Sequence, residues 1–424
     1  MGSVDYAESP RDTVAIKALQ VLWPHFPRRS GPTIAPDMET LLSSATQALE
    51  QVLALARRDS YLDHSKHDAL NSPVLRSLFG FSKWSRIAAT QAVMRFPINL
   101  RPLLGVPKVE NPKGLALFAQ AHFACARAGL GAEHESHALA IGSRLLEVRS
   151  GAGWGYHYPW QDLGFFAPAG TPNAVVTSFV CQALMDAYEQ SRDARFIDAV
   201  DGALTFLLEA LPVLKNTDDE LCVGYMPMPM TMRVMDVSIL VGTAIARHAK
   251  LAASDAHLPV ARRLVNYVVR RQTADGAWFY CDPPEDSPVK IDNYHTGFIL
   301  DALWQYASCT GDHAHDHAYE RGLRFYGEHL FNPDGAPRWM SDRDFPHDVH
   351  GAAQGVITFS RHLAEFPGLA ERVAQWAMQH LYSGAGTFYY QQRRHYTVHT
   401  SFMRWCNAWM ARALSCLVEA HAGR

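Results

Sequence analysis

An internal repeat is the feature of this sequence that most constrains its fold. In one unit a helical pattern ends at residues 272–278 (Gln-Thr-Ala-Asp-Gly-Ala-Trp), an aromatic segment follows, and a new apolar helix begins after residues 291–298 (Ile-Asp-Asn-Tyr-His-Thr-Gly-Phe). Similar glycine and aromatic segments precede other apolar runs, at 153–160, 222–227, 334–339 and 386–390. One such unit cannot bury its own apolar face, so neighbouring units must pack on one another.

Apolar periodicity predicts pairs of helices. The first members begin near residues 114, 174, 234, 295, 350 and 401. This spacing of about 50 to 60 residues fits a helical hairpin plus a rim segment. The predicted helices span 38–56, 114–128, 133–149, 174–190, 194–211, 234–252, 258–272, 295–308, 314–330, 350–365, 369–381 and 401–420.

These helices predict an all-α (α/α)6 barrel, in which six parallel inner helices are surrounded by six outer helices. The pattern contains six first members but five second members, and the helix at 38–56 supplies the missing outer partner. No linker interrupts residues 37–424, which are therefore predicted to form one barrel domain. Residues 1–36 contain five prolines and predict an extended arm. Residues 58–112 are expected to be irregular and to cover one mouth of the barrel.

The repeat resembles the α/α-toroid superfamily over about residues 110–420. That superfamily includes terpenoid cyclases, protein prenyltransferase β subunits, six-hairpin glycosidases, sugar 2-epimerases and the helical domain of glucuronyl C5-epimerases. The motifs Gly-Trp-Gly-Tyr-His-Tyr-Pro-Trp, Ile-Asp-Asn-Tyr-His-Thr-Gly-Phe and Asp-Val-His-Gly-Ala-Ala-Gln further resemble bacterial proteins associated with exopolysaccharide biosynthesis. The first resemblance implies a fold and the second a pathway; neither implies one reaction.

Charge and cysteine content narrow the possible partners. A formal net charge of -3 gives no support for nucleic acid as a partner. Seven cysteines without paired spacing predict reduced thiols and a cytoplasmic location. The N-terminal residues lack the apolar core of a signal peptide, and no apolar run is long enough for a transmembrane segment.

Polar residues gather where the predicted inner helices begin, and these helix starts share one mouth of a barrel. Three imidazoles, His295, His350 and His399, are interpreted as equivalent positions of successive repeats. A neutral imidazole is a suitable general base, and an imidazolium is a suitable acid. A role in capping helices or bonding neighbouring repeats stays open for each one. The predicted catalytic residues are His295, His350, His399, Asp292, Asp348 and Tyr294.

Aromatic and cationic residues near the same mouth predict a sugar-binding surface. Flat rings can stack on a sugar, and a guanidinium can bind a carboxylate or phosphate. The alternative is that the rings wedge the rim between helices, which the Gln-x-x-Asp-Gly-x-Trp setting of Trp278 favours because triterpene cyclases carry a similar stabilising repeat. The predicted substrate-binding residues are Trp154, Tyr156, His157, Tyr158, Trp160, Trp278 and Arg404.

Metal-dependent chemistry has little support in the sequence. The Asp-x-Asp-Asp and Asp-Asp-x-x-Asp motifs of terpenoid cyclases are absent. Asp236 and His295 match two zinc ligands of prenyltransferase β subunits, but Ser238 occupies the position of the thiolate. Cys281 is a conceivable substitute. No metal and no other cofactor is predicted.

Proton transfer on a sugar is the favoured function. Asp292 and Asp348 could serve a glycosidase, but candidate histidines and tyrosines outnumber candidate carboxylates, which favours an epimerase or a lyase. We therefore expect a sugar or glycan as substrate and epimerisation of a sugar as the reaction, with a uronate as one candidate sugar. A glycoside hydrolase, a polysaccharide lyase, a non-catalytic glycan-binding scaffold and an isoprenoid-binding enzyme remain alternatives.

Overall fold

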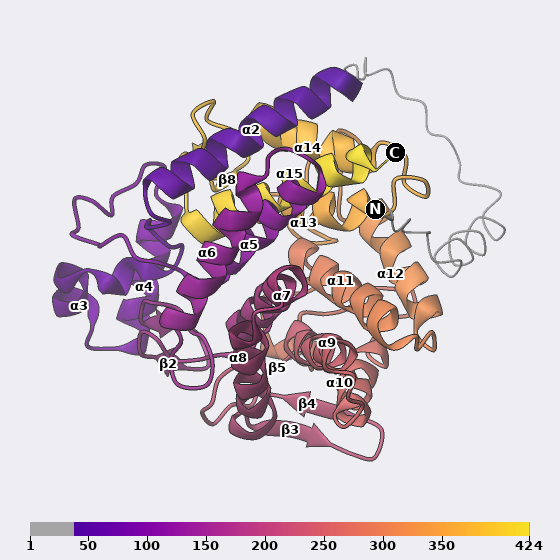
Figure 1. Ribbon diagram of the computed structural model, residues 1–424. Coiled ribbons are helices and arrows are strands. Elements are labelled where there is room, and N and C mark those ends of the chain that lie inside the picture. Colours follow the sequence, from indigo (N-terminus) through magenta and orange to yellow (C-terminus); the bar gives the residue numbers. More distant parts are fainter. Residues whose placement is uncertain (1–37, 424) are drawn as a thin grey trace. The chain divides into compact units, whose positions relative to one another are not determined.

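Two concentric rings of helices make up the fold (Figure 1). The computed structural model describes residues 38–423, in which each inner helix packs on the next and the last packs back on the first. The all-α (α/α)6 barrel predicted from the repeat is thereby confirmed. The inner helices are α5 (Pro112–Arg127), α7 (Ala174–Ser191), α9 (Met235–Ala252), α11 (Asn293–Thr310), α13 (Val349–Ser360) and α15 (Trp409–Ala422), the last preceded by η4 (Met403–Ala408). The outer helices are α2 (Met38–Arg58), α6 (Glu133–Glu147), α8 (Ala194–Thr205), α10 (Leu258–Val269), α12 (Asp316–His329) and α14 (Leu369–His380).

Burial distinguishes the two rings. Every residue of the inner helix α13 is buried, because this helix is surrounded by neighbours. The outer helix α10 buries one stripe made of Ala261, Leu264, Val265, Tyr267 and Val268 and leaves its other face to solvent. An apolar stripe of this kind is typical of a helix that covers a core.

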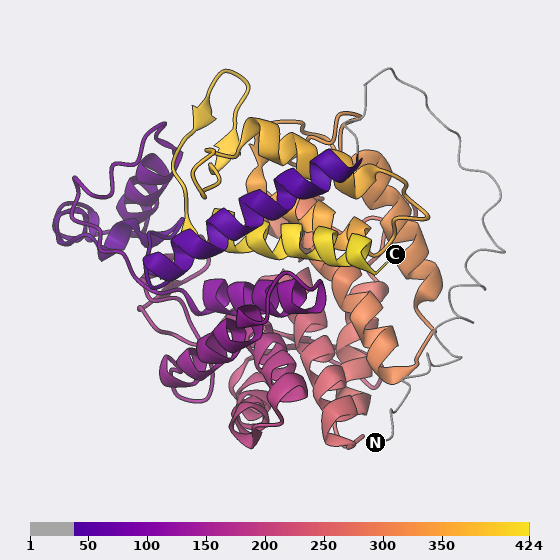
Figure 2. The same cartoon turned by 45° about the horizontal axis from the view of Figure 1, so that its top comes forward.

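The rim glycines explain how the outer ring is spaced. Gly276, Gly335 and Gly386 all have positive φ, between 82° and 98°, and each lies against the backbone of the following outer helix. The neighbours are Arg321 of α12, Arg372 of α14 and Gln51 of α2, and a side chain at the glycine would collide with their carbonyl groups. Since the third contact falls on α2, this helix takes the sixth outer position. Figure 2 shows the indigo α2 running beside the yellow C-terminal helices.

Two of the rim tryptophans are wedges. Trp154 and Trp278 are both buried, and their indole N–H groups donate to carbonyl oxygens near the ends of the preceding outer helices, Leu145 at 2.7 Å and Val268 at 3.0 Å. A buried indole needs such a partner. The prediction that Trp154 and Trp278 stack on a substrate is therefore wrong, because both rings are enclosed in the packing between helices.

The connection from α2 to α5 is more regular than predicted. It contains η1 (Asp68–Asn71), α3 (Pro73–Phe79) and α4 (Lys83–Arg95), so the prediction of an irregular segment fails there. Ser72 caps α3 ahead of Pro73, and Ser82 forms a capping box with Ser85 at the start of α4. We name residues 59–111 the cover segment. Its backbone bonds the rim of the last repeat, since Met403 N–H donates to the His64 carbonyl and His399 N–H to the Pro97 carbonyl.

The strands are short and lie at the rim. Paired segments are β1 (Trp160–Gln161) with β2 (Phe166–Ala167), β3 (Val213–Asn216) with β4 (Leu221–Val223), β5 (Arg233–Val234) with β6 (Cys281–Asp282), and β7 (His347–Asp348) with β8 (Gln391–Gln392) and β9 (Thr397–Val398). All these pairings are antiparallel. They connect the loops that lead into the inner helices, so they position the residues at those helix starts.

Some predicted boundaries shift. The helix α13 ends at Ser360 rather than 365, before Pro367 and Gly368, and the last inner helix begins with η4 at Met403 rather than 401. The predicted N-terminal arm, 1–36, lies outside the described residues. No helix among residues 38–423 combines the length and apolarity that a membrane crossing requires.

Candidate active site

The helix caps set the register at the N-terminal end of the inner ring. Asn111, Asn173, Asp292 and Asp348 are the N-cap residues of α5, α7, α11 and α13, and Val234 occupies this position for α9. Asx residues favour this position because their oxygens can accept from the first free N–H groups of a helix. Two positions after these caps stand Lys113, Val175, Asp236, Tyr294 and His350.

This register corrects the proposed equivalence of the three histidines. His350 lies two residues after its cap and so matches Tyr294, whereas His295 lies three residues after its cap. The rings of Tyr294 and His350 stack with centroids 4.5 Å apart, and Tyr294 also contacts His295 at 4.2 Å. His295 and His350 thus share Tyr294 as a neighbour.

His399 is not part of this group. It is exposed, precedes η4 by four residues, and packs edge-on against Tyr389 at 4.7 Å. The prediction that it is equivalent to His295 and His350 is wrong because His399 directly follows the strand β9, which ends at Val398, and a loop separates it from the start of η4 at Met403.

His295 is held by carboxylates. Its Nδ1 bonds Asp292 Oδ2 at 2.8 Å, and its side chain is 17% exposed. Burial lowers the pKa of His295, but the charges of Asp292 and Asp236 and the hydrogen bond to Asp292 outweigh burial, and the pKa is raised above its ordinary value. The imidazolium form is therefore favoured. The second ring nitrogen, Nε2, has no hydrogen-bond partner among residues 38–423 and is free for a substrate.

His350 has the opposite environment. Both of its ring nitrogens are buried without a hydrogen-bond partner in the described chain, and its ring is enclosed by Tyr294, Trp405 and Trp409. Burial, followed by the charges of Lys113, Arg404, Lys66 and His295, holds the pKa of His350 well below its ordinary value. Neighbouring histidines with pKa values moved apart are a common arrangement for an acid and a base.

Three buried cations converge on these histidines. The ammonium of Lys66 lies 3.3 Å from the centre of a Trp405 ring, and that of Lys113 lies 3.8 Å from the centre of Phe179. The Arg404 guanidinium lies 5.0 Å from Tyr156 and leaves its Nε without a partner. None of the three forms an ion pair with a carboxylate within residues 38–423. We name Lys66, Lys113 and Arg404 the cation cluster.

Burial changes the ionisation of the two lysines. Burial lowers the pKa of Lys66 to about 7, although Asp348 opposes the shift. Burial, together with the charge of Arg404, holds the pKa of Lys113 well below its ordinary value. A bound anion would reverse both shifts by pairing with the ammonium groups. The cation cluster therefore favours an anionic ligand.

The carboxylates have different tasks. Asp348 accepts from the His350 backbone N–H at 2.9 Å, from Trp405 Nε1 at 2.7 Å and from Gln391 at 3.2 Å, so it positions the residues around it. Asp236 leaves Oδ1 buried without a partner among residues 38–423, and burial raises its pKa despite the neighbouring His295 and Lys113. Asp236 is thus a carboxyl group of this site with a buried, unused oxygen.

Aromatic rings form a wall beside the cation cluster. Tyr156 stacks on Tyr158 at 5.1 Å, and Trp160 packs edge-on against Tyr156 at 5.6 Å and Tyr225 at 5.4 Å. Of the predicted substrate-binding residues, these tyrosines, Trp160 and Arg404 therefore lie together. His157 is half-buried, and its carbonyl accepts from Asn71 of the cover segment.

Sequence reasoning missed Lys66 and Lys113 and gave Asp236 a different role. Lys113 and Asp236 carried a signal, because they stand two residues after helix caps, as Tyr294 and His350 do. Lys66 lies in the cover segment outside the repeat, so no periodicity pointed to it.

The residues considered for zinc do not assemble into a metal site. Ser238 Oγ accepts from the Val223 N–H, and the Cys281 thiol donates to the Pro283 carbonyl. Within residues 38–423, one group of three potential metal ligands lies close together, and it does not include the residues considered for zinc. It consists of Glu50, Cys125 and His134, where α2 meets α5 and α6.

Comparisons with known proteins agree with the barrel. No protein-family model matches the sequence, and a search of curated protein sequences finds no match. Solved structures do match. A sugar epimerase from a ruminal bacterium has a TM-score of 0.62 at 11% identity, over 89% of this chain and 98% of its own. Cellobiose 2-epimerase from Bacillus thermoamylovorans has a TM-score of 0.60 at 11% identity, over 90% and 100%.

A hydrolase shares the architecture as well. A mannosidase of glycoside hydrolase family 76 from Bacteroides thetaiotaomicron has a TM-score of 0.54 at 12% identity, over 90% of this chain and 98% of its own. These likenesses establish the fold. At such identities they leave the reaction to be argued from the residues.

Proposed function

We propose that the protein is a carbohydrate-active enzyme that epimerises an acidic sugar by moving a proton at the carbon next to a carboxylate. The observation that carries this proposal is the cation cluster, which lacks carboxylate partners within the described chain and surrounds two histidines with oppositely shifted pKa values. The epimerases that share the fold support it. Roles in the cytoplasm and in exopolysaccharide synthesis remain predictions.

The cations supply the chemical driving force. A carboxylate makes the neighbouring C–H bond acidic only when its negative charge is neutralised, because removal of the proton adds a second negative charge. Lys66, Lys113 and Arg404 would bind the carboxylate and stabilise that developing charge in a site with little water. The wall of Tyr156 and Trp160 would hold the sugar ring.

The histidines then divide the proton transfers. The neutral His350 accepts the proton as the C–H bond breaks, and the protonated His295 donates a proton from Nε2 to the opposite face as the new C–H bond forms. Asp292 and Asp236 keep His295 charged before the donation. Each cycle exchanges protons with water and involves no oxidation or reduction.

A hydrolase is the second candidate. Asp236 is a buried carboxyl group with a raised pKa and a free oxygen, which are properties of the general acid of a glycosidase. The mannosidase on the same fold supports this alternative. Asp292, the other nearby carboxylate, is bonded to His295 and so is less available as a nucleophile.

Solvent-deuterium exchange distinguishes these reactions. We would incubate the protein in D₂O with glucuronate and with oligosaccharides that contain uronic acids, and follow the sugar protons by NMR. The proposal predicts loss of the proton signal next to the carboxylate and appearance of a second epimer. Release of a reducing sugar without exchange would establish the hydrolase, and a new alkene signal would establish a lyase.

A further inference from the structure

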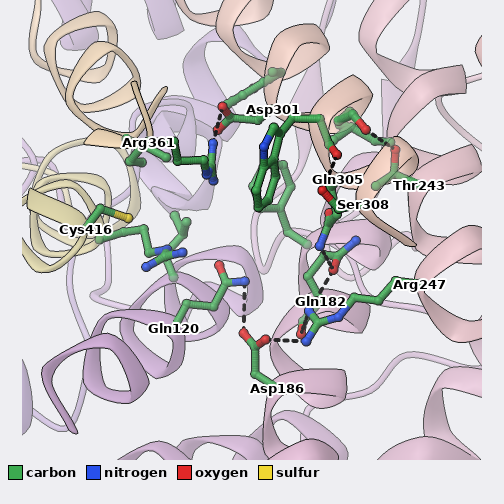
Figure 3. A pocket seen from close by; sticks show the side chains of 18 of the residues that line it. Gln120, Gln182, Asp186, Thr243, Arg247, Asp301, Gln305, Ser308, Arg361 and Cys416 are labelled. Atoms are coloured by element: carbon green, nitrogen blue, oxygen red, sulfur yellow. Dashed lines mark hydrogen bonds and ion pairs between the residues drawn. The ribbon is translucent and has the colours of Figure 1, made fainter. Parts of the chain in front are cut away.

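A cavity of about 550 Å³ opens at the other end of the inner ring (Figure 3). Residues from the C-terminal half of every inner helix line it, including Arg127 and Glu419 from the last turns of α5 and α15. A volume in this range suits a small organic ligand. Representative lining residues, one from each helix or its C-cap, are Gln120, Gln182, Arg247, Gln305, Arg361 and Arg412.

An aromatic layer separates this cavity from the candidate active site. Phe179, Phe298 and Trp409 pack on one another with ring centroids 5.3 to 5.5 Å apart, and all three line the cavity. The same three rings contact the ammonium of Lys113. The two ends are therefore distinct sites with a shared aromatic floor.

The cavity wall presents amides in fixed positions. Arg247 donates to Gln182 at 2.9 Å and to Asp186 at 2.6 Å, Gln120 donates to Asp186 at 3.2 Å, and Gln305 donates to Gln182 at 2.9 Å. Figure 3 shows this network on one side of the cavity, with Asp301 and Arg361 on the other. Each glutamine keeps further donor or acceptor capacity for the hydroxyl groups of a ligand.

Several polar groups of the wall have no partner. Ser178 Oγ and Trp409 Nε1 belong to side chains that are 1% and 2% exposed, and neither forms a hydrogen bond within residues 38–423. Arg412 leaves Nη1 unpartnered and forms no ion pair with a described carboxylate. The lining includes five cationic and four anionic side chains, so one positive charge is in excess.

We propose that this cavity binds an anionic sugar, independently of the reaction at the other end. Its negative group pairs with Arg412, and its hydroxyls bond the glutamines and Ser178. Trp304 is 40% exposed at the wall, with the guanidinium of Arg361 4.8 Å from its ring centre, and offers a flat face to the sugar. A carboxylate or a phosphate could supply the charge.

Two cysteines give a site-specific measurement. Cys309 and Cys416 line the cavity and are partly exposed, whereas the other five cysteines are buried. We would measure iodoacetamide labelling of each cysteine by peptide mass spectrometry, with D-glucuronate, D-glucose 1-phosphate and D-glucose as probes. We expect the two anionic sugars to slow labelling of Cys309 and Cys416, and glucose to protect them far less.

Variants test the assignment of the charge. Arg412→Gln should weaken protection about tenfold or more, because a charge-assisted hydrogen bond is lost. Arg76→Gln, an exposed arginine on α3, is the matched control and should change nothing. If Arg412→Gln does not fold, Gln305→Ala should also weaken binding. His295→Ala should leave protection intact.

Several results of these labelling experiments would overturn the proposal. They are absence of protection by all three sugars, equal protection by glucose and glucuronate, and protection that Arg412→Gln leaves unchanged. Loss of protection in His295→Ala would assign the bound sugar to the other end of the barrel and would also overturn it. Protection by only one of the two anions would support the site and identify the charged group.

Discussion

The two ends of the inner ring use charge in different ways. At the C-terminal ends, cations pair with carboxylates: Arg247 with Asp186, Arg361 with Asp301 and Arg127 with Glu419. At the N-terminal ends, Lys66, Lys113 and Arg404 lie on aromatic rings without such partners in the described chain. The first arrangement balances most of its charges within the described chain and leaves Arg412 without an ion pair, whereas the second leaves all three cations without one.

Helix dipoles make this difference more informative. A helix carries partial positive charge at its N-terminus and partial negative charge at its C-terminus. Arg127 and Arg361 lie at helix C-termini, where a cation is stabilised. Lys113 stands at the second residue of α5, where the dipole disfavours it. A buried basic group kept in an unfavourable position is a candidate functional group, and this observation supports the proposed anionic substrate.

The largest expected effect is a loss of turnover on replacing His295, and it distinguishes a catalytic role of this residue from a structural one. We expect His295→Ala to lower turnover by about 10³-fold, because it removes a general acid, and to shift Tm by less than about 4 °C. His313→Ala is the matched control, since His313 makes the same pairing with an aspartate three residues away but is exposed. Steady-state kinetics and thermal unfolding would measure both. A cooperative loss of folding in His295→Ala would show that His295 is structural.

Loss of a buried tryptophan that packs between helices should cost more stability than loss of a tryptophan that lines the C-terminal cavity. Trp278→Ala should lower the free energy of unfolding by about 3 to 5 kcal/mol, because it leaves a cavity and an unpaired carbonyl. Trp304→Ala should cost about 1 kcal/mol or less, since Trp304 is 40% exposed. Urea unfolding would give both values. Similar losses in the two variants would contradict the distinction between wedge and binding surface.

The pH dependence of stability tests the buried lysine. Because the folded-state pKa of Lys66 is about 7, below the ordinary 10.5, the unfolded chain binds more protons between these values. Its contribution to stability is therefore complete above pH 10.5 and is lost as the pH falls through 7. Between pH 9 and pH 7 the wild type should lose about 2 kcal/mol more than Lys66→Met. Lys83→Met, at an exposed lysine, should behave as the wild type.

The smallest expected effect is that of replacing His399, which lies apart from His295 and His350. His399→Ala should change stability by less than about 0.5 kcal/mol, because the side chain is exposed. Turnover should stay within about twofold of the wild type by the same reasoning. A loss comparable with that of His295→Ala would bring His399 back into the catalytic group and would contradict the register set by the helix caps.

The repeat allowed the fold to be predicted because its glycines and apolar runs reflect packing that every unit shares. Gly276, Gly335 and Gly386 mark close approaches to successive outer helices. The same regularity misled the interpretation of Trp154 and Trp278, which recur because they pack and not because they bind. A residue repeated in every unit is more informative about architecture than about chemistry.

The site was predicted only in part, for a related reason. His295, Asp292, Tyr294 and His350 were found because they gather at helix starts, but their relative register depended on the cap positions. Lys66 comes from the cover segment, whose approach to Trp405 depends on tertiary structure. The direction of each histidine pKa likewise depends on neighbours from several repeats.

Deuterium incorporation compared among three proteins tests the central claim most directly. The claim is that the N-terminal end performs proton transfer on an acidic sugar and that the C-terminal end only binds. Uronate substrates in D₂O should give the second, deuterated epimer with the wild type and with Arg412→Gln, and almost none of that epimer with His295→Ala, because no acid remains on the opposite face. Epimer formation that survives in His295→Ala but disappears in Arg412→Gln would contradict the account, because it would place the chemistry at the opposite end of the barrel.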